Sequence, residues 1–292
     1  MKKQAILIIA HNNIWTLEKL LKSLDSKYFD IYIHVDKKSN INNLDVIAQF
    51  VKVSKIYIYK EINVRWSDYS QVECELFLLE KALQNGEYSY FHLLSGVDLP
   101  LKKSEIIYNY FNEAKNKEFI HFYSEELPIE KYCWLKYFWL FRKYSRNSKI
   151  LYLLEFISIS LQKLININRL KKHNLKFMTG ANWFSITKEF SEYLLSKKNF
   201  IYTTFKNTKS ADEIFLQTIL FNSPFKKNLF YSKYDDNYIS CMRAIDWKRG
   251  NPYVYVSSDL NELVNSPYLF ARKFDENLDK EIIEKIYSRN YK

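Results

Sequence analysis

The chain has 292 residues, of which 44 are basic and 33 acidic, so its formal net charge is +11. Apolar residues make up 47% of it, which excludes an intrinsically disordered chain, and four glycines and five prolines exclude collagen-like and linker-like sequences. The length fits one α/β domain of enzyme size or two smaller ones. The three cysteines, Cys74, Cys133 and Cys241, lie far apart and form no CxxC, so we expect no disulfide framework, no zinc site and a reducing compartment.

The first hundred residues alternate between predicted strands and helices. Residues 5–10 (AILIIA) form an apolar run without a cleavage pattern, which predicts a buried first strand and not a targeting signal. Further strands are predicted at 30–35, 55–60 and 90–94, and helices at 16–24 and 70–83. This alternation predicts a parallel sheet with helices on both faces. Three polar residues, His11, Asp36 and Asp98, follow strand ends, where ligands of such sheets bind.

The positive charge is concentrated between residues 131 and 176, where eleven Lys and Arg face one acid, Glu155. Within it, residues 150–167 have the period of a helix with one polar stripe, formed by Glu155, Ser158, Gln162 and Asn166. The rest of that surface is apolar, which is typical of a buried helix or of one lying on a membrane interface. Flanking cations, among them Arg146, favour a membrane interface over a plain core helix, and a solvated basic face is the other alternative for this segment. No apolar stretch reaches 18 residues, so we expect no spanning helix.

The second half is less regular. A strand or turn is predicted around Gly180, helices are predicted at 189–196, 212–221 and 281–287, and residues 231–267 are rich in turn signals. We find no internal repeat and no low-complexity linker.

Several common catalytic motifs are missing. There is no GxGxxG and no GxxxxGK[ST], which excludes dinucleotide enzymes of the usual kind and P-loop NTPases. There is also no GxSxG, no HExxH and, among thirteen aspartates, no DxD.

Two short segments carry candidate chemistry. Ser210-Ala-Asp-Glu213 precedes a predicted helix, and it fits either an N-terminal capping box or a carboxylate placed as a general base. Phe270-Ala-Arg-Lys-Phe-Asp275 sets two cations between aromatic residues, and it fits either a surface salt-bridge cluster or a clamp on a phosphate pair. Trp247, beside Gly and Pro, fits either a sugar-stacking platform or a loop plug, and Trp66 and Trp183 leave the same alternatives open.

Seven segments in order give a specific resemblance. They are HVDKKS (34–39), VRWSDYSQVECELFLLEKAL (64–83), YFHLLSGVDLPLK (90–102), TGANWFSITKEF (179–190), ADEIFLQTIL (211–220), IDWKRGNP (245–252) and FARKFD (270–275). Together they resemble the core-2/I-branching β-1,6-N-acetylglucosaminyltransferase and peptide O-xylosyltransferase family, glycosyltransferase family 14. The resemblance covers residues 5–285 and is weakest from 120 to 176.

The resemblance implies an α/β fold of the GT-A type in a single domain, 1–292. Residues 1–120 would form the nucleotide-binding half and 121–292 the acceptor-side and catalytic half, with the basic apolar insert at 131–176. It also implies inverting transfer from a UDP-sugar without a divalent metal. The absence of a DxD motif from the sequence agrees with this expectation. Glu213 would be the catalytic base. The nucleotide-sugar would be bound by Ala10, His11, Asn12, Asp36, Asn63, Arg65, Asp98, Arg272 and Lys273. The acceptor would be bound by Trp183, Asp212, Trp247 and Arg249.

The departures from the family also inform the interpretation. Animal members carry a membrane anchor and many disulfides, whereas this sequence suggests a bacterial cytoplasmic enzyme at the inner face of the membrane. The donor is expected to be UDP-GlcNAc, with UDP-xylose as the alternative, because FARKFD and IDWxxGxP look closer to the xylosyltransferases. The acceptor is expected to be a glycan or a lipid-linked glycan. A nucleic-acid-binding protein is the competing class, but the charge is confined to one segment and no nucleic-acid motif occurs.

Overall fold

A six-stranded sheet forms the centre of the molecule. The structure, a computed structural model, describes residues 2–41, 43–145 and 148–291. The strands are β1 (Lys3–Ala10), β2 (Phe29–Val35), β3 (Ile56–Tyr59), β4 (Tyr88–Ser95), β6 (Phe119–Ile120) and β7 (Phe184–Thr187). Their order is β3-β2-β1-β4-β7-β6, with β1 to β4 mutually parallel and β7 antiparallel to both neighbours. The expected α/β architecture, a mostly parallel sheet flanked by helices, is confirmed.

The apolar run at residues 5–10 forms β1 because the strand is covered on both faces. Ala5 and Leu7 point into one half of the core, Ile6 and Ile8 point into the other, and all four are fully buried. A continuous apolar run, and not an alternating one, is what a strand between two helix layers requires.

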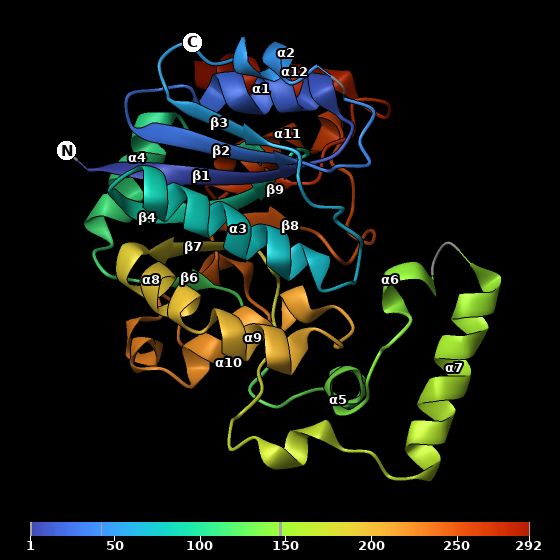
Figure 1. The fold of residues 1–292 in the computed structure, drawn as a ribbon. Helices are drawn as coiled ribbons and strands as arrows, with labels where there is room; N and C mark the ends of the chain where they lie inside the picture. Colours follow the sequence, from blue (N-terminus) through green and yellow to red (C-terminus); the bar gives the residue numbers. More distant parts are fainter. Residues whose placement is uncertain (1, 42, 146–147, 292) are drawn as a thin grey trace.

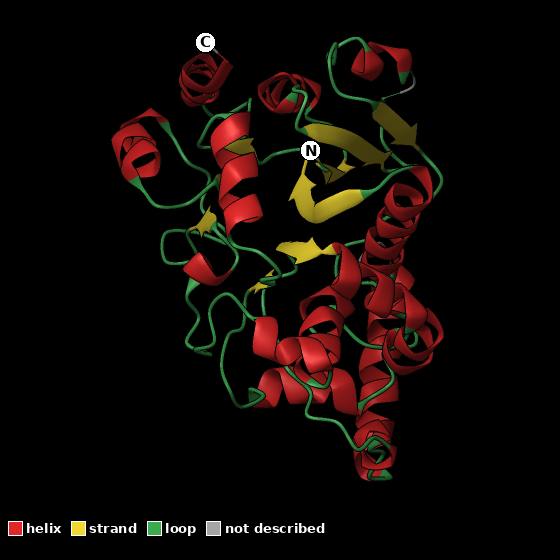
Figure 2. Ribbon diagram, turned by 90° about the vertical axis from the view of Figure 1, so that its left-hand side faces the viewer, coloured by secondary structure: helices red, strands yellow, loops and turns green. Residues whose placement is uncertain are grey.

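Helices lie on both sides of the sheet (Figures 1 and 2). One face is covered by α3 (Ser70–Asn85), α8 (Lys188–Ser196), α9 (Lys198–Phe205) and α10 (Phe215–Phe221). The other face is covered by α1 (Ile14–Leu24), α2 (Asp45–Ala48), α4 (Ser104–Glu113), α11 (Leu260–Asn265) and α12 (Lys280–Tyr291). Helix α1 buries four leucines at i, i+3, i+4 and i+7, from Leu17 to Leu24. Each such side chain contributes about 1.5–3 kcal/mol of burial free energy.

A second sheet of three short strands covers part of the same face. It consists of β5 (Leu99–Pro100), β9 (Phe270–Arg272) and β8 (Arg243–Ile245), in that order. Arg243 is fully buried and donates to the carbonyls of Leu93 and Phe184, at 3.1 and 2.6 Å, and to the Ser185 hydroxyl at 3.1 Å. Its guanidinium thereby joins the small sheet to strands β4 and β7.

The segment from residue 129 to 172 projects from the body (Figure 1). It holds α5 (Ile129–Lys136), α6 (Arg142–Ser145), α7 (Lys149–Leu164) and a 3₁₀ turn, Arg169–Lys172. Helix α5 packs onto the core through Trp134 and Leu135. Arg169 is buried and donates to the carbonyls of Tyr137 and Asn207, at 3.2 and 2.8 Å. Among the described residues, no helix has both the length and the apolar character that crossing a bilayer would need.

The remaining turns are 3₁₀ helices at Ala211–Glu213, Pro224–Asn228, Tyr238–Ser240 and Ser257–Asp259. All three cysteines are free.

Candidate active site

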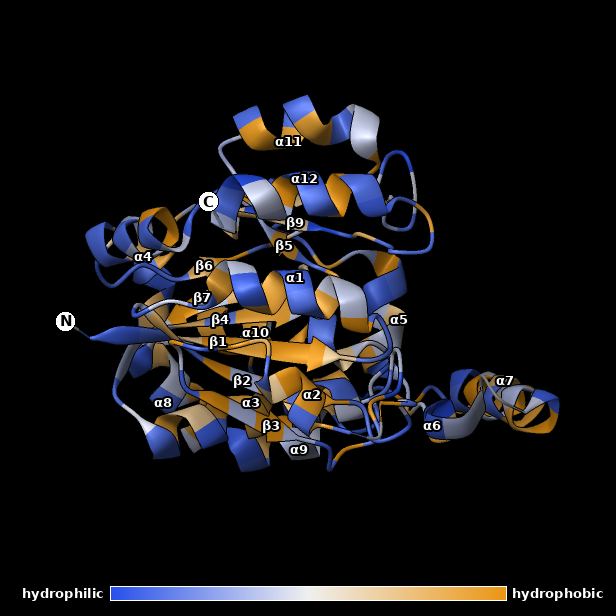
Figure 3. Cartoon of the chain, turned by 90° about the horizontal axis from the view of Figure 1, so that it is seen from above, coloured by the Kyte–Doolittle hydropathy of each residue, from blue (hydrophilic) through white to orange (hydrophobic). Residues whose placement is uncertain are grey.

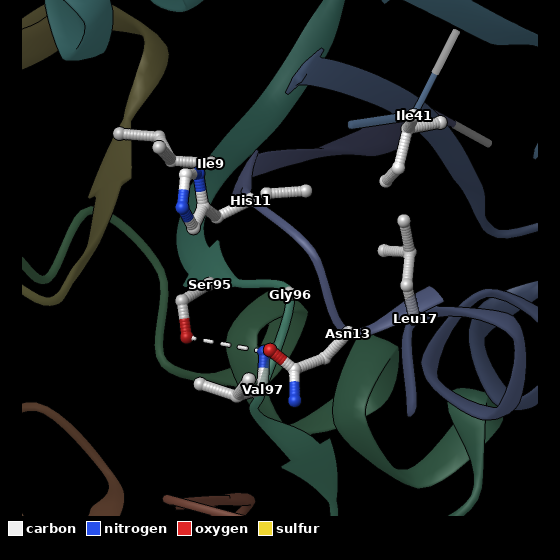
Figure 4. Close-up of a pocket in the computed structure, with 9 residues that line it drawn as sticks. Ile9, His11, Asn13, Leu17, Ile41, Ser95, Gly96 and Val97 are labelled. Atoms are coloured by element: carbon white, nitrogen blue, oxygen red, sulfur yellow. Dashed lines mark hydrogen bonds between the residues drawn. The ribbon is translucent and has the colours of Figure 1, made fainter. Parts of the chain in front are cut away.

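A pocket of about 110 Å³ lies where β1 and β4 end (Figure 4). Its lining comprises Ile9, Ala10, His11, Asn13, Leu17, Ile41, Ser95, Gly96 and Val97. Two of the residues expected to bind the nucleotide-sugar, Ala10 and His11, are among them. The neighbouring Asn12 instead accepts a hydrogen bond from the Asn40 N–H at 3.4 Å. The pocket therefore occupies the edge of the sheet that the strand pattern indicated.

Asp36 closes the turn beside this pocket. Its backbone N–H donates to the Ala10 carbonyl at 2.9 Å, and its carboxylate accepts the Lys38 N–H at 2.9 Å. The same carboxylate faces His11 Nδ1 at 3.5 Å and Lys38 Nζ at 3.4 Å. The structure thus brings Ala10, His11 and Asp36 together, as expected for residues at the ends of two neighbouring parallel strands.

The 63–65 segment lies on the other side of Lys38. Lys38 Nζ donates to the Val64 carbonyl at 2.7 Å, while Asn63 is exposed. Arg65 donates from Nη1 to the Lys143 carbonyl at 2.5 Å, and its guanidinium lies 4.4 Å from the Tyr144 ring centroid. Arg65 therefore links the 63–65 segment to α6.

A largely buried cation, Arg272, lies beside the turn that follows β4. Arg272 has its guanidinium carbon 3.8 Å from the Trp183 ring centroid and its Nε 3.8 Å from Asp98 Oδ1. Its Nε and Nη1 have no hydrogen-bond partner among the described residues. Burial lowers the pKa of this guanidinium, and Asp98 partly offsets the effect. An anion is the partner that such desolvated donors require.

Asp98 and Lys273 complete this corner. Asp98 is buried and accepts the Ser95 N–H at 2.9 Å and the Ser95 hydroxyl at 2.5 Å, so it fixes the turn and holds Arg272. The Phe274 N–H donates to the Val97 carbonyl at 3.0 Å, which places Lys273 next to the same turn. Within the described part of the chain, no carboxylate lies within 4.0 Å of Lys273 Nζ.

Glu213 lies across the site, at the end of a 3₁₀ turn. Its carboxylate forms an ion pair with Lys131 of α5, and Lys131 Nζ lies 3.8 Å from the Trp134 ring centroid. The capping box expected as one alternative is wrong, because Ser210 has a left-handed backbone with φ 47° and caps no helix. Its hydroxyl pairs with that of Ser67 at 2.7 Å instead. Glu213 is therefore a half-buried carboxylate whose side chain does not serve to cap a helix.

Two more carboxyl groups lie behind Glu213. Burial, with Glu213 adding to it, raises the pKa of Asp212 to about 7. Glu75 on α3 is fully buried, and burial together with Asp212 holds its pKa well above the usual range. Sequence reasoning missed Glu75. The available signal was its position on the apolar face of α3, between Val72 and Leu76.

The segment 179–183 connects the two sides of the site. The Gly180 N–H donates to the Glu213 carbonyl at 3.0 Å, and Trp183 carries Arg272 on its ring. Three residues of chain span at most about 11 Å. Gly180 approaches so closely that a Cβ there would lie 1.8 Å from the His121 carbonyl oxygen. The backbone of Glu213 and the guanidinium of Arg272 thus contact the two ends of one short segment, while the Glu213 carboxylate is held by Lys131.

The chain is similar to proteins of a known family. The model of the family described as Core-2/I-Branching enzyme matches residues 5–262. The chain belongs to this family. It is 25% identical to a bovine β-1,3-galactosyl-O-glycosyl-glycoprotein β-1,6-N-acetylglucosaminyltransferase over 93% of this chain and 66% of that protein. It is 23% identical to the xylosyltransferase sqv-6 of Caenorhabditis briggsae over 92% of this chain and 34% of that protein. The chain therefore spans less than two thirds of the length of these relatives.

Solved glycosyltransferase structures resemble the chain only distantly. The glycosyltransferase GlyE of Streptococcus pneumoniae is 11% identical over all of this chain and 61% of its own, with a TM-score of 0.45. Mouse xyloside xylosyltransferase 1 is also 11% identical, over 93% of this chain and 97% of its own, with a TM-score of 0.41.

The Core-2/I-branching match extends over the loop that contains Trp247. Trp247 is 46% exposed, so it does not plug the loop. Arg249 donates to Asp246 at 2.5 Å and to Asp259 at 2.6 Å, and stacks 4.1 Å from the Tyr253 ring centroid. Arg249 thus holds the loop in shape, while Trp247 presents a face to solvent. Among the described residues of this family member, no three His, Cys, Asp or Glu side chains are grouped to hold a metal ion.

Proposed function

We propose that this Core-2/I-branching family member is an inverting glycosyltransferase that moves a sugar from a UDP-sugar to a hydroxyl of a glycan or glycolipid acceptor. The observation that carries the proposal is the largely buried guanidinium of Arg272, whose Nε and Nη1 have no hydrogen-bond partner among the described residues although Asp98 lies 3.8 Å away. It lies beside the strand-end pocket and is connected to the backbone of Glu213 through residues 179–183. A desolvated cation on one side and a carboxylate on the other are the two groups that such a transfer needs.

Glu213 acts as the base. The acceptor hydroxyl replaces Lys131 as the partner of the Glu213 carboxylate and gives up its proton as its oxygen attacks the anomeric carbon. The bond from that carbon to the phosphate oxygen breaks on the opposite side, so the configuration inverts. One carboxylate suffices for this step, whereas hydrolases use two.

Arg272 and Lys273 receive the leaving diphosphate. Negative charge grows on UDP as the bond breaks, and two fixed cations stabilise that charge more than they stabilise the bound donor. In this proposal they take the part that a divalent metal plays elsewhere. Ala10, His11, Asn12, Asp36, Asn63 and Arg65 bind the nucleotide end, and Asp98 positions Arg272.

The acceptor lies on the side of Glu213. Trp247 offers an exposed flat surface for a sugar ring, and Arg249 shapes the loop that presents it. Trp183 is buried and carries Arg272 on its ring, so the sequence-based assignment of Trp183 to the acceptor would require Arg272 and the sugar to share that side chain. Asp212 lies next to the base in the chain. The donor is UDP-GlcNAc, as the name of the bovine relative suggests, and UDP-xylose is the alternative suggested by the xylosyltransferase relatives.

A donor screen tests the proposal. Thermal unfolding is measured with UDP-GlcNAc, UDP-xylose and other UDP-sugars, and the true donor raises the melting temperature by mass action. UDP release is then measured with that donor and candidate acceptors, with Arg272→Met as the control that removes the cation and keeps the side-chain volume. If no UDP-sugar raises the melting temperature and none is turned over, the proposal fails.

A further inference from the structure

Helix α7 (Lys149–Leu164) packs on the protein with its polar side. Glu155 and Gln162 are the buried residues of this helix. The Gln162 amide accepts the Phe138 N–H at 2.7 Å and donates to the Phe138 carbonyl at 2.9 Å. Glu155 accepts hydrogen bonds at 3.2 Å from Ser145 and from Arg142. Of the polar stripe expected from the sequence, Glu155 and Gln162 are buried and Ser158 is half-buried, whereas Asn166 is exposed beyond the end of the helix. Within α7 itself the polar side therefore faces inward.

The apolar side of α7 is exposed. Its exposed large side chains, with Ile165 directly after the helix, are Ile150, Tyr152, Leu153, Leu154, Phe156, Ile157, Leu161, Leu164 and Ile165. Five of them, from Ile150 to Leu164, follow each other at intervals of three or four residues and so form one continuous stripe. Burial of this stripe in the chain's own core, the alternative that the sequence left open, is wrong for the described structure. An exposed apolar patch of this kind marks a contact surface.

Exposed cations border the stripe. Lys149 and Lys163 are 14 residues apart, close to four helical turns, so they lie on the same side of α7 about 21 Å apart. Lys143, Lys171 and Lys172 are also exposed, while Arg146 lies outside the described residues. Glu155, the one acid between residues 131 and 176, is buried against Arg142. The described outer surface of this segment therefore presents positive charge without a carboxylate.

The charge distinguishes between possible occupants of this face. A second copy of the chain would bring the same lysines against each other, since a symmetric dimer pairs a surface with itself. An anionic bilayer supplies an apolar interior for the stripe and negatively charged headgroups for the lysines. We propose that α7, with Lys143, Lys149, Lys163, Lys171 and Lys172, binds the surface of an anionic lipid bilayer, with the outer stripe of α7 in the interface.

The position of α7 determines which side of the protein would face the bilayer. Strands β1, β2 and β4 point with their carboxyl ends toward the side of the molecule where α6 and α7 lie, and two views agree on this (Figures 1 and 3). The pocket and Asp36 are at those strand ends. If the proposed transfer is correct, the bilayer therefore lies on the side of the molecule where the donor pocket opens. The membrane contact itself does not depend on catalysis.

Vesicle co-sedimentation of the full chain tests the proposal. We expect binding to vesicles of phosphatidylcholine with phosphatidylglycerol at low salt, weaker binding at high salt, and little binding to phosphatidylcholine alone, because salt screens exposed charges. Lys149→Glu/Lys163→Glu should lower the partition coefficient by about 25-fold or more, since each cation contributes about fivefold. Lys115→Glu/Lys117→Glu, two exposed lysines between α4 and β6 with the same change in net charge, should leave binding unchanged.

The apolar stripe has its own matched pair. Leu153, 56% exposed, becomes Glu in one variant, and Ile106 of α4, 52% exposed, becomes Glu in the control. Leu153→Glu should reduce binding at least about tenfold, and Ile106→Glu should not. The melting temperature with and without a UDP-sugar checks that the variants are folded, and it tests the proposed function separately.

Two results would overturn the membrane contact. One is the absence of binding of the unmodified chain to anionic vesicles at low salt. The other is equal loss of binding in Lys115→Glu/Lys117→Glu and in Lys149→Glu/Lys163→Glu. A dimer in sedimentation experiments that Leu153→Glu dissociates, without vesicle binding, would assign the face to a second copy instead.

Discussion

Replacing Gly180 by Ala tests the segment that joins the two halves of the candidate site. The new Cβ would lie 1.8 Å from the His121 oxygen and 2.6 Å from its carbonyl carbon, whereas ordinary contact begins near 3.4 Å. The difference, 1.6 Å, must be taken up by backbone. Neither segment moves freely, because Gln217 donates to the carbonyls of both His121 and Ala181, at 3.2 and 2.8 Å.

The expected cost follows from this displacement. Overpacking of a well-filled interior costs about 1–3 kcal/mol, which lowers the melting temperature of a chain of this size by about 2–12 °C. A displacement near 1 Å can lower turnover about 100-fold. We therefore expect Gly180→Ala to lose both stability and UDP release.

Melting temperature and initial rate of UDP release are the measurements. For the melting temperature, Gly96→Ala is the matched control, because its Cβ would lie 3.2 Å from the Ala10 Cβ and needs a shift of a few tenths of an ångström. A Gly180→Ala protein that melts and turns over like the unmodified chain would refute the close approach of residues 180 and 121.

Four further predictions concern the acid and cation groups. Glu213→Gln should lower turnover by about 10²–10⁴-fold but keep the donor-induced rise in melting temperature, because the amide cannot accept the acceptor's proton; unchanged turnover would remove Glu213 from the base role. Activity should survive EDTA, whereas loss that manganese restores would contradict the metal-free mechanism. Lys273→Ala should raise the KM for the donor and lower kcat, since the charge it contacts grows in the transition state; an effect on neither parameter would exclude the diphosphate role. The raised pKa of Asp212 means that the folded chain keeps a proton there that the unfolded chain releases near its ordinary pKa of 3.8. This contribution to stability is present at low pH and is lost as pH rises through about 7. Urea unfolding at several pH values should therefore show Asp212→Asn gaining stability relative to the unmodified chain as pH rises, and a constant difference would argue against a buried, protonated Asp212.

The sequence predicted the elements whose patterns are long. The apolar run of β1 and the leucine spacing of α1 need only their own neighbours to be interpreted, so the parallel half of the sheet and its strand-end residues followed. The strands β5, β8 and β9 have two or three residues each, and no period can be seen over that length. Their pairing depends on contacts between residues far apart in the chain.

The residues of the candidate site that belong to a sequence motif were predicted. Those whose role depends on burial in the folded chain were missed. Glu213 and Arg272 came from the resemblance of their segments to a family. Glu75 belongs to no such motif. In a predicted helix a glutamate is normally assigned to the exposed side, and only the packing of α3 shows that this one is buried. Ser210 fitted a cap because the residue types were right, but its left-handed backbone turns the side chain toward Ser67. For α7 the period was visible, but the sequence could not tell which face turned inward.

The way α7 is attached to the rest of the protein determines which substitutions related sequences can tolerate in this helix. Gln162 recognises the two backbone groups of Phe138, and Glu155 takes hydrogen bonds from Ser145 and Arg142, so neither can be exchanged without losing a specific partner. The outer side chains fit against no counterpart among the described residues, and only their polarity is constrained. In related sequences, Ile, Leu, Phe and Met should therefore replace one another freely along the outer stripe, with volumes uncorrelated between positions, while the amide and the carboxylate stay fixed. If a larger side chain at one position of the stripe were instead accompanied by a smaller one at a neighbouring position, the stripe would be packed against another protein surface.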